Sequence, residues 1–154
     1  MTDCREYALR LIAFKDRTKK ELLSKLKEKN YEEIQIEETV EFLICYGYIN
    51  DKKYAEKFVI DAINLKKWGK QRIESELLRR GISKDIIRRA IESFCPQDMR
   101  ESLTEQMKSR YENADLSDIK ERTRIFNYYA RRGFSCEEIK GALNSICAFC
   151  DITD

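Results

Sequence analysis

Two cysteines near the C-terminal end of the chain, Cys147 and Cys150, have the C-x-x-C spacing of redox-active thiol pairs and of half a zinc site. A zinc site needs further ligands, and no second C-x-x-C pair supplies them. The chain contains no histidine, which excludes Ser-His and Cys-His nucleophile pairs and every histidine metal site. No glycine arrangement resembles a P-loop or a dinucleotide-binding fingerprint. We therefore expect no cofactor, no metal and no enzymatic activity.

A cluster of basic residues surrounds the single tryptophan, Trp68. Residues 51–98 hold 12 basic and 8 acidic side chains, whereas the whole chain has a net charge of only +2. A basic strip that contains an aromatic ring can contact phosphates and stack on a base, and it can equally meet an acidic protein surface. A third interpretation is a solvated helix face with Trp68 packed between structural modules. The pattern indicates a binding surface or a plain helix surface, not a reaction centre.

The sequence RRGIS of residues 79–83 returns 52 residues later as RRGFS in residues 131–135. Glycine after a helix favours the left-handed C′ position, because it has no Cβ to clash there. Arginines before it complement the negative end of the helix dipole, and a serine two residues after it can cap the next helix. The repeated sequence therefore predicts a helix end, a tight turn and a helix start. Asn30 stands at the same point of an earlier copy, and asparagine tolerates the left-handed conformation.

The residues that flank these turns repeat as well, at offsets of 51 and 52 residues. Each copy follows another segment with apolar residues at helical spacing. T-x-x-E at Thr18 and S-x-x-E at Ser135 have the spacing of capping boxes, Asp51 is a predicted N-cap, and the third copy is expected to begin at Asp98. A period of this size indicates an elongated repeat array, in which neighbouring modules share interfaces. We predict an all-α fold of three tandem three-helix modules, about nine helices in all, at residues 1–50, 51–97 and 98–154.

Composition supports a helical protein without a membrane segment. The 154 residues include only one proline and five glycines, which suits connected helices. No apolar run approaches the roughly 20 residues that cross a bilayer, and no hydrophobic leader follows Met1, so we expect a cytoplasmic location. The six cysteines are then expected to be reduced, with Cys45 and Cys147 behaving as small hydrophobes among apolar neighbours.

Three longer stretches resemble the RecX family of bacterial regulatory proteins. GYINDKKYAEKF, residues 47–58, resembles the family signature. ALRLIAFKDRTKKELLSKL, residues 8–26, is similar to the first module of the family, and WGKQRIESELLRRGIS, residues 68–83, to the second. The resemblance extends from about residue 5 to about residue 146, is looser in the third module, and departs at residues 13–17, where the family often has more arginine.

The signature stretch also has the physical pattern of a corner between two modules. Gly47 is expected to end one helix, and Asp51 to cap the next. Apolar and aromatic side chains are expected to fill the junction and to line the core face after it: Tyr48, Ile49, Tyr54 and Phe58.

The resemblance implies a regulator of the RecA recombinase. Members of this family lie in the helical groove of the RecA filament on single-stranded DNA, where they inhibit its ATPase and strand exchange and limit filament extension; some also bind DNA directly. The resemblance therefore implies that the partners are the RecA filament and single-stranded DNA, with roles in recombination, DNA repair and the SOS response. We expect a monomer. From their positions, the residues expected to contact the filament or DNA are Lys66, Lys67, Lys70, Arg72, Arg79, Arg80, Arg88, Arg89, Arg131 and Arg132.

Two other functions fit the same residues. Compact three-helix modules with tight turns also describe helix-turn-helix proteins, which bind duplex DNA tightly, without RecA and with strong dependence on salt. A helical-repeat adaptor for another protein would depend on neither DNA nor RecA. The near-neutral total charge argues against the direct DNA-binding function.

Overall fold

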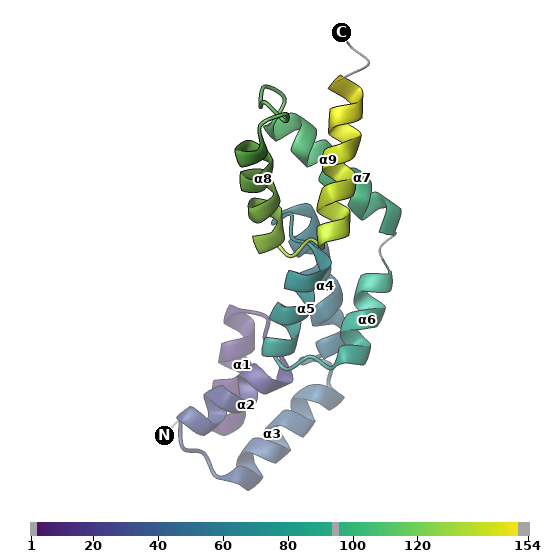
Figure 1. The fold of residues 1–154 in the computed structure, drawn as a ribbon. Helices are drawn as coiled ribbons and strands as arrows, with labels where there is room; N and C mark the ends of the chain where they lie inside the picture. The colour runs from purple at the N-terminus through teal and green to yellow at the C-terminus, as the bar shows by residue number, and fades with distance from the viewer. Residues whose placement is uncertain (1–2, 94–95, 151–154) are drawn as a thin grey trace. The chain divides into compact units, whose positions relative to one another are not determined.

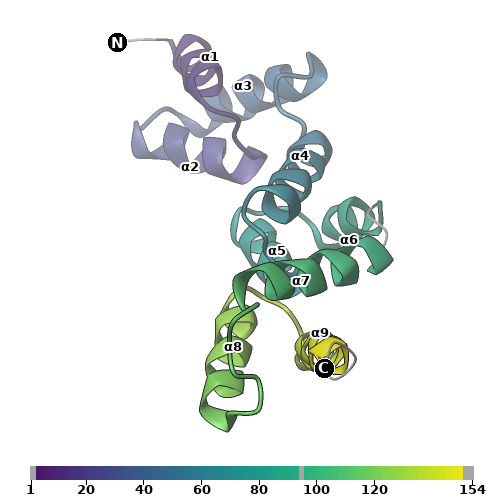
Figure 2. The same ribbon diagram turned by 90° about the horizontal axis from the view of Figure 1, so that it is seen from above.

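The computed structural model describes residues 3–93 and 96–150, and every regular element within them is an α-helix (Figures 1 and 2). The prediction of an all-α fold with about nine helices is confirmed for these residues. The nine helices are α1 (Cys4–Phe14), α2 (Lys19–Glu28), α3 (Glu33–Cys45), α4 (Asp51–Asn64), α5 (Lys70–Arg79), α6 (Lys84–Glu92), α7 (Pro96–Arg110), α8 (Ile119–Arg131) and α9 (Cys136–Cys150).

Capping boxes begin α2 and α9, as their sequences predict. The hydroxyl of Thr18 accepts a hydrogen bond from the backbone N–H of Glu21, and the Glu21 carboxylate accepts one from the backbone N–H of Thr18, both at 3.2 Å. Ser135 and Glu138 form the same reciprocal pair, at 3.2 and 2.7 Å. Each box satisfies N–H groups that have no partner within the helix, which fixes where the helix starts.

Helix α4 starts differently from the prediction. The N–H of Lys53 donates to the side-chain oxygen of Asn50 at 3.0 Å, so Asn50 caps this helix. Asp51 is already the first helical residue, and its carboxylate accepts a hydrogen bond at 3.0 Å from the backbone N–H of Lys19, the first residue of α2. A carboxylate at that point complements the positive end of the α2 dipole. The prediction that Asp51 caps its own helix is therefore wrong: it caps another one.

Helix α7 begins at Pro96, two residues before the predicted start at Asp98. Proline suits the first turn of a helix because the N–H that it lacks would have no intrahelical partner there. The predicted start at Asp98 is therefore wrong, and that residue lies inside the helix.

The predicted turns have left-handed backbone at their central residue. The φ angles are +74° at Gly47, +83° at Gly81, +91° at Gly133 and +58° at Asn30. In both RRGxS turns, the N–H groups of the glycine and of the next residue bond back to carbonyls of the preceding helix at 2.9–3.2 Å. This arrangement is a Schellman motif, which satisfies the last carbonyls of a helix. The prediction that these turns end helices is confirmed.

The chain packs as two compact units. The first unit comprises Met1–Phe58 and Glu76–Ala90, and the second comprises Val59–Ser75 and Ile91–Asp154. The boundaries fall inside helices, so α4 and α5 each contribute one end to each unit.

One hydrophobic core cluster of the first unit is made by α1, α2 and α3, which contact one another in all three pairs. Its buried residues recur at helical spacing and end at the junction. They are Cys4, Ala8, Leu22, Leu26, Ile36, Val40, Leu43 and Ile49. Ile49 is buried as predicted, whereas Tyr48 is 54% exposed and only borders the core, with its ring 6.4 Å from that of Phe42. The expectation that Tyr48 fills the junction is therefore wrong.

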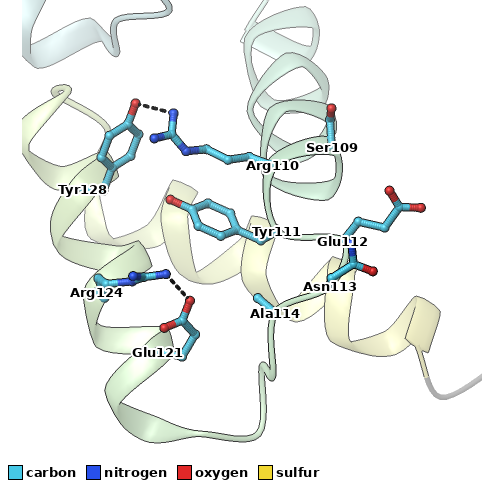
Figure 3. A pocket seen from close by; sticks show the side chains of 9 residues that line it. All are labelled: Ser109, Arg110, Tyr111, Glu112, Asn113, Ala114, Glu121, Arg124 and Tyr128. Carbon is cyan, nitrogen blue, oxygen red and sulfur yellow. Dashed lines mark hydrogen bonds and ion pairs between the residues drawn. The ribbon is translucent and has the colours of Figure 1, made fainter.

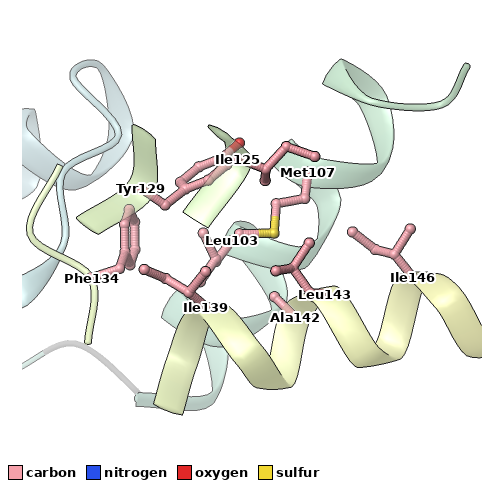
Figure 4. Close-up of a cluster of buried hydrophobic side chains, with 9 residues drawn as sticks. All are labelled: Leu103, Met107, Ile125, Tyr129, Phe134, Ile139, Ala142, Leu143 and Ile146. Atoms are coloured by element: carbon pink, nitrogen blue, oxygen red, sulfur yellow. The ribbon is translucent and has the colours of Figure 1, made fainter. Parts of the chain in front are cut away.

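One hydrophobic core cluster of the second unit lies where α7 and α8 pack against α9 (Figure 4). Its buried residues are Leu103, Met107, Ile125, Tyr129, Phe134, Ile139, Ala142, Leu143 and Ile146. Tyr129 is the largest fully buried side chain of this cluster, and burial raises the pKa of its phenol to about 12. The rings of Phe134 and Tyr129 meet edge to face at 5.9 Å, so the RRGFS turn is anchored by its phenylalanine.

The cysteines occupy varied positions. Cys4 is buried, Cys147 is half-buried, Cys45 and Cys136 are exposed, and all four are free thiols. Cys45 does not behave as a buried hydrophobe, because it ends α3 on an outward face. Cys95 and the side chain of Cys150, with which Cys147 has C-x-x-C spacing, lie outside the described residues.

The part of the chain that the structure describes contains neither a membrane-spanning helix nor a cluster of metal ligands. No helix there is long and apolar enough to cross a membrane. No group of three or more cysteine, aspartate or glutamate side chains there is placed to hold a metal ion.

Candidate interaction surfaces around the repeated turns

The RRGIS turn packs on the start of α2, within the first unit. The hydroxyl of Thr18 donates a hydrogen bond to the backbone carbonyl of Arg80 at 2.6 Å. The ammonium of Lys20 donates to the carbonyl of Arg79 at 3.4 Å. Gly81 approaches so closely that a Cβ added to it would lie 2.5 Å from the Cβ of Lys20. The glycine is therefore required twice, by its positive φ and by the neighbouring helix.

Arg80 fills the centre of this contact. Its guanidinium donates to the hydroxyl of Tyr54 at 2.6 Å and to the carboxylate of Glu21 at 3.4 Å, and its carbon lies 5.0 Å from the ring centre of Phe58. The Arg80 side chain is only 23% exposed. Burial raises the pKa of Tyr54, and the charge of Arg80 offsets part of that effect. Tyr54 and Phe58 thus bind an arginine where the sequence predicts that they line a core face.

The RRGFS turn packs on the start of α5 in the same manner, within the second unit. The N–H of Gly69 donates to the carbonyl of Arg132 at 2.8 Å, and the N–H of Gln71 donates to that of Gly133 at 3.1 Å. A Cβ on Gly69 would lie 2.4 Å from the backbone of Gly133, and a Cβ on Gly133 would lie 2.4 Å from the backbone nitrogen of Arg72. Two backbones therefore touch at a pair of glycines.

The two contacts have the same arrangement, in which an RRGxS turn packs on the start of a helix. We call each of them a joint. Thr18 and Gly69 are 51 residues apart, and Arg80 and Arg132 are 52 residues apart. A hydroxyl donates to the arginine carbonyl in the first joint, and a backbone N–H does so in the second. RRGxS recurs because it does two things at once: it ends a helix, and it docks on the start of the middle helix of the preceding repeat. One joint lies in each compact unit, which explains why the unit boundaries fall inside the middle repeat.

Trp68 belongs to the second joint. Its ring lies 4.5 Å from the ammonium of Lys66 and 4.1 Å from the guanidinium carbon of Arg72. Arg132 donates to the carbonyl of Lys66 at 2.5 Å, and Arg72 donates to that of Arg131 at 3.5 Å. The indole is half-buried and has two cations close to its ring, so it packs within the repeat.

The predicted contact residues therefore divide into two groups. Arg80, Arg132 and Arg72 are partly buried in the joints. The remaining seven are exposed: Lys66, Lys67, Lys70, Arg79, Arg88, Arg89 and Arg131. We call Arg79, Arg88 and Arg89 the first-unit surface, and Lys66, Lys67, Lys70 and Arg131 the second-unit surface.

Four of the exposed cations have carboxylate neighbours on their own helix. Arg79 pairs with Glu76 at 2.6 Å, Lys70 lies 3.8 Å from Glu74, and Asp85 pairs with both Arg88 and Arg89. All of these pairs are three or four residues apart on one helix, and their basic side chains are 58–73% exposed. Such pairs typically stabilise by about 0–1 kcal/mol, so an anionic partner can replace the carboxylate at little cost.

A pocket of about 640 Å³ lies between the end of α7 and α8 (Figure 3). Arg110 donates to the hydroxyl of Tyr128 at 2.8 Å with its guanidinium 4.4 Å from that ring, and Arg124 pairs with Glu121. Both arginines therefore already have partners among the residues that line the pocket. The sequence did not indicate it, because Arg110 and Tyr128 belong to no repeated pattern.

Two domain descriptions of one protein family match this chain. "RecX, first three-helix domain" matches residues 4–43, and "RecX, second three-helix domain" matches residues 50–91. The two matched ranges contain α1, α2, most of α3, α4, α5 and nearly all of α6.

Similar proteins and structures carry the same name. The chain is 30% identical over 154 residues to a regulatory protein RecX of Clostridium beijerinckii. The alignment covers 98% of this chain and 71% of that protein. It is 33% identical to a regulatory protein RecX of Caldanaerobacter subterraneus subsp. tengcongensis, over 92% of this chain and 70% of that one. The crystal structure of RecX from Lactobacillus salivarius superposes with a TM-score of 0.80 at 26% identity, over 94% of this chain and 95% of the other.

Proposed function

Because the chain belongs to the RecX family of regulatory proteins, we propose that it binds the RecA filament on single-stranded DNA and inhibits its ATPase, strand exchange and extension. Through that inhibition it would modulate recombination, DNA repair and the SOS response. The observation that carries the proposal is the match to both RecX domains, together with relatives that align over almost the whole chain. The name of these relatives is that of a regulator.

The repeated joint supports a filament as the partner. A filament presents the same subunit surface again and again, and a repeat protein presents equivalent positions at a regular interval along its own chain. Exposed cations near both joints can meet acidic subunit surfaces or DNA phosphates. They comprise the first-unit surface and the second-unit surface.

The first experiment is a titration of single-stranded-DNA-dependent ATP hydrolysis by the cognate RecA. We expect inhibition by this protein. Inhibition well below one copy per RecA would favour action at filament ends, and inhibition only near equal stoichiometry would favour coating of the groove. Unchanged hydrolysis, with a preparation that is helical by circular dichroism, would contradict the proposal.

The second-unit surface is tested by the double substitution Lys67→Glu and Lys70→Glu. Both side chains are exposed, whereas Arg72 is left intact because it packs on Trp68. We expect filament binding to weaken about 10-fold or more, since reversing charges at a rim imposes repulsion on an acidic partner. The matched control is Lys120→Glu with Lys140→Glu, two exposed lysines outside the surface, which gives the same change in net charge. Equal binding by the two double variants would remove this surface from the mechanism.

Direct DNA binding is a second candidate, favoured by one feature of the first unit. Helix α6 exposes Lys84, Arg88 and Arg89 over less than two turns, as the recognition helix of a helix-turn-helix protein would. This function predicts tight duplex binding without RecA that weakens steeply with added salt. An electrophoretic mobility assay with duplex DNA at two salt concentrations separates the two candidates.

A further inference from the structure

Two large apolar side chains are exposed to solvent at corresponding positions of the first two repeats. Phe14 is 88% exposed and Leu65 is 77% exposed. They are 51 residues apart, the same offset that relates Thr18 to Gly69. A single exposed apolar residue on a protein surface is ordinary. Its recurrence at one position of a repeat is not explained by packing, since neither side chain belongs to a core cluster.

The surroundings of the two side chains repeat as well. Phe14 is the last residue of α1, and Leu65 directly follows α4. A lysine comes next in both repeats, Lys15 in the first and Lys66 in the second, and both of these residues are exposed. Lys67 adds another exposed lysine beside Leu65. Each position therefore has an exposed lysine directly after the apolar side chain, whereas the next residue is Asp16, paired with Lys57 at 2.6 Å, in the first repeat and Lys67 in the second.

The joints hold both positions in place. Phe14 and Leu65 each lie four residues before the residue that receives the docked turn, Thr18 or Gly69. The segment after Leu65 is fixed further by the hydrogen bond from Arg132 to the carbonyl of Lys66. A side chain presented on a fixed segment loses little conformational freedom when it binds.

We propose that Phe14 and Leu65 are equivalent anchors that insert into the same apolar pocket, rimmed by carboxylates, on different subunits of the RecA filament. This inference rests on the proposed function. A polymer of identical subunits is the partner that offers one pocket repeatedly, and exposed lysines beside each anchor match an acidic rim. Binding by the second anchor follows that of the first at a high effective concentration, so two weak contacts give one tight complex.

The third repeat marks the limit of the pattern. Ser117 stands 52 residues after Leu65, and the neighbouring Leu116 is half-buried against the second-unit core. The chain therefore offers two anchors of this kind, one in each compact unit.

The test uses the full chain with Phe14→Ala, Leu65→Ala and the double variant, in co-sedimentation with RecA filaments assembled on single-stranded DNA. We expect about 10-fold weaker binding for each single variant and about 100-fold or more for the double variant. Ile119→Ala is the matched control, because Ile119 is 79% exposed but has no counterpart in the other repeats. Circular dichroism and thermal midpoints should not change, since neither anchor is buried.

The outcomes separate this inference from the proposed function. If the unsubstituted chain does not bind RecA filaments, the proposed function itself fails. If it binds and the double variant binds as well as the Ile119→Ala control, only the anchors are refuted. A double variant that changes self-association in sedimentation velocity, with filament binding intact, would assign the two side chains to contacts between copies of this chain and overturn the inference.

Discussion

At the scale of single residues, Gly47 and Gly133 end their helices with the same backbone geometry but in different surroundings. Both have positive φ, +74° and +91°. Nothing lies within 4 Å of a Cβ built on Gly47, whereas a Cβ on Gly133 would lie 2.4 Å from the backbone of Arg72. The two positions therefore separate the conformational reason for glycine from the steric one.

Substituting alanine at each glycine should give clearly different losses of stability. Gly47→Ala should lower the free energy of unfolding by about 1–2 kcal/mol, because only the left-handed conformation is strained. Gly133→Ala should cost about 3 kcal/mol or more, because overpacking against a backbone adds to that strain. Urea denaturation followed by circular dichroism measures both values. Equal losses would show that the joint around Gly133 is loose.

The phenol of Tyr129 gives a prediction about alkaline pH. Its pKa is raised from the ordinary 10.0 to about 12 by burial first, and then by the neighbouring Tyr111 and Tyr128. A group whose pKa is higher in the folded state contributes its full stabilisation of the fold at pH values below its unfolded pKa. That contribution is lost as the pH rises from the unfolded pKa through the folded pKa. The free energy of unfolding should thus fall between pH 10 and 12 because of this residue.

The variant Tyr129→Phe keeps the ring and removes the ionisable group. It should lose less stability than the unsubstituted chain over the same pH range, with a difference on the order of 2 kcal/mol. Urea denaturation at a series of pH values between 9 and about 12 measures this difference. Parallel profiles for the two proteins would contradict the assignment of the alkaline loss to Tyr129.

At the scale of elements, the helices are tied together through their ends. A turn docks on a helix start in both joints, and Asp51 from the start of α4 caps the start of α2. Helix α8 is 13 residues long, whereas α2 and α5 have 10 each. Its extra length places Glu121, which is 52 residues after Gly69, inside the helix. The start of α8 therefore differs from the starts of α2 and α5, which receive the docked turns.

The capping roles of Asn50 and Asp51 can be tested by hydrogen exchange at single backbone amides. Asp51→Ala should speed hydrogen exchange at Lys19 and leave Lys53 unchanged, because its carboxylate binds the N–H of Lys19. Asn50→Ala should do the reverse, because its side chain binds the N–H of Lys53. Each substitution should cost about 1 kcal/mol, as expected for a helix cap. Faster exchange at Lys53 in the Asp51→Ala variant would restore the capping role first predicted from the sequence.

At the scale of the whole molecule, the two compact units share α4 and α5, so neither can unfold without breaking a helix of the other. We therefore expect one cooperative transition. Arg80 lies in the first unit, and Trp68, the only tryptophan, lies in the second. A substitution at Arg80 should accordingly be reported by the fluorescence of Trp68.

Arg80→Ala should lower the free energy of unfolding by about 2–3 kcal/mol, because a largely buried arginine loses its packing and leaves polar partners unsatisfied. Arg79→Ala is the matched control. The Arg79 side chain is 73% exposed, so its removal should change the free energy of unfolding by about 0.5 kcal/mol or less. Denaturation followed by Trp68 fluorescence and by circular dichroism should give the same midpoint for each variant. An Arg80 variant that shifts only the circular dichroism would mean that the units unfold separately.

The sequence by itself determined the helices, the positions of most helix ends and the repeat that relates them. Apolar spacing, capping boxes and left-handed glycines act over a few residues, so their signals are local and can be read without a fold. It also carried the resemblance to RecX, because that depends on the order of residues alone.

Only the tertiary structure decided what the repeated arginines do. Arg79 and Arg80 are adjacent and identical in the sequence, yet Arg79 is exposed and Arg80 lies between Tyr54, Glu21 and Phe58. Asp51 likewise caps a helix that begins 32 residues earlier in the chain. Such roles depend on which distant backbone comes within a few ångströms, and that follows from how the modules pack, not from any local pattern.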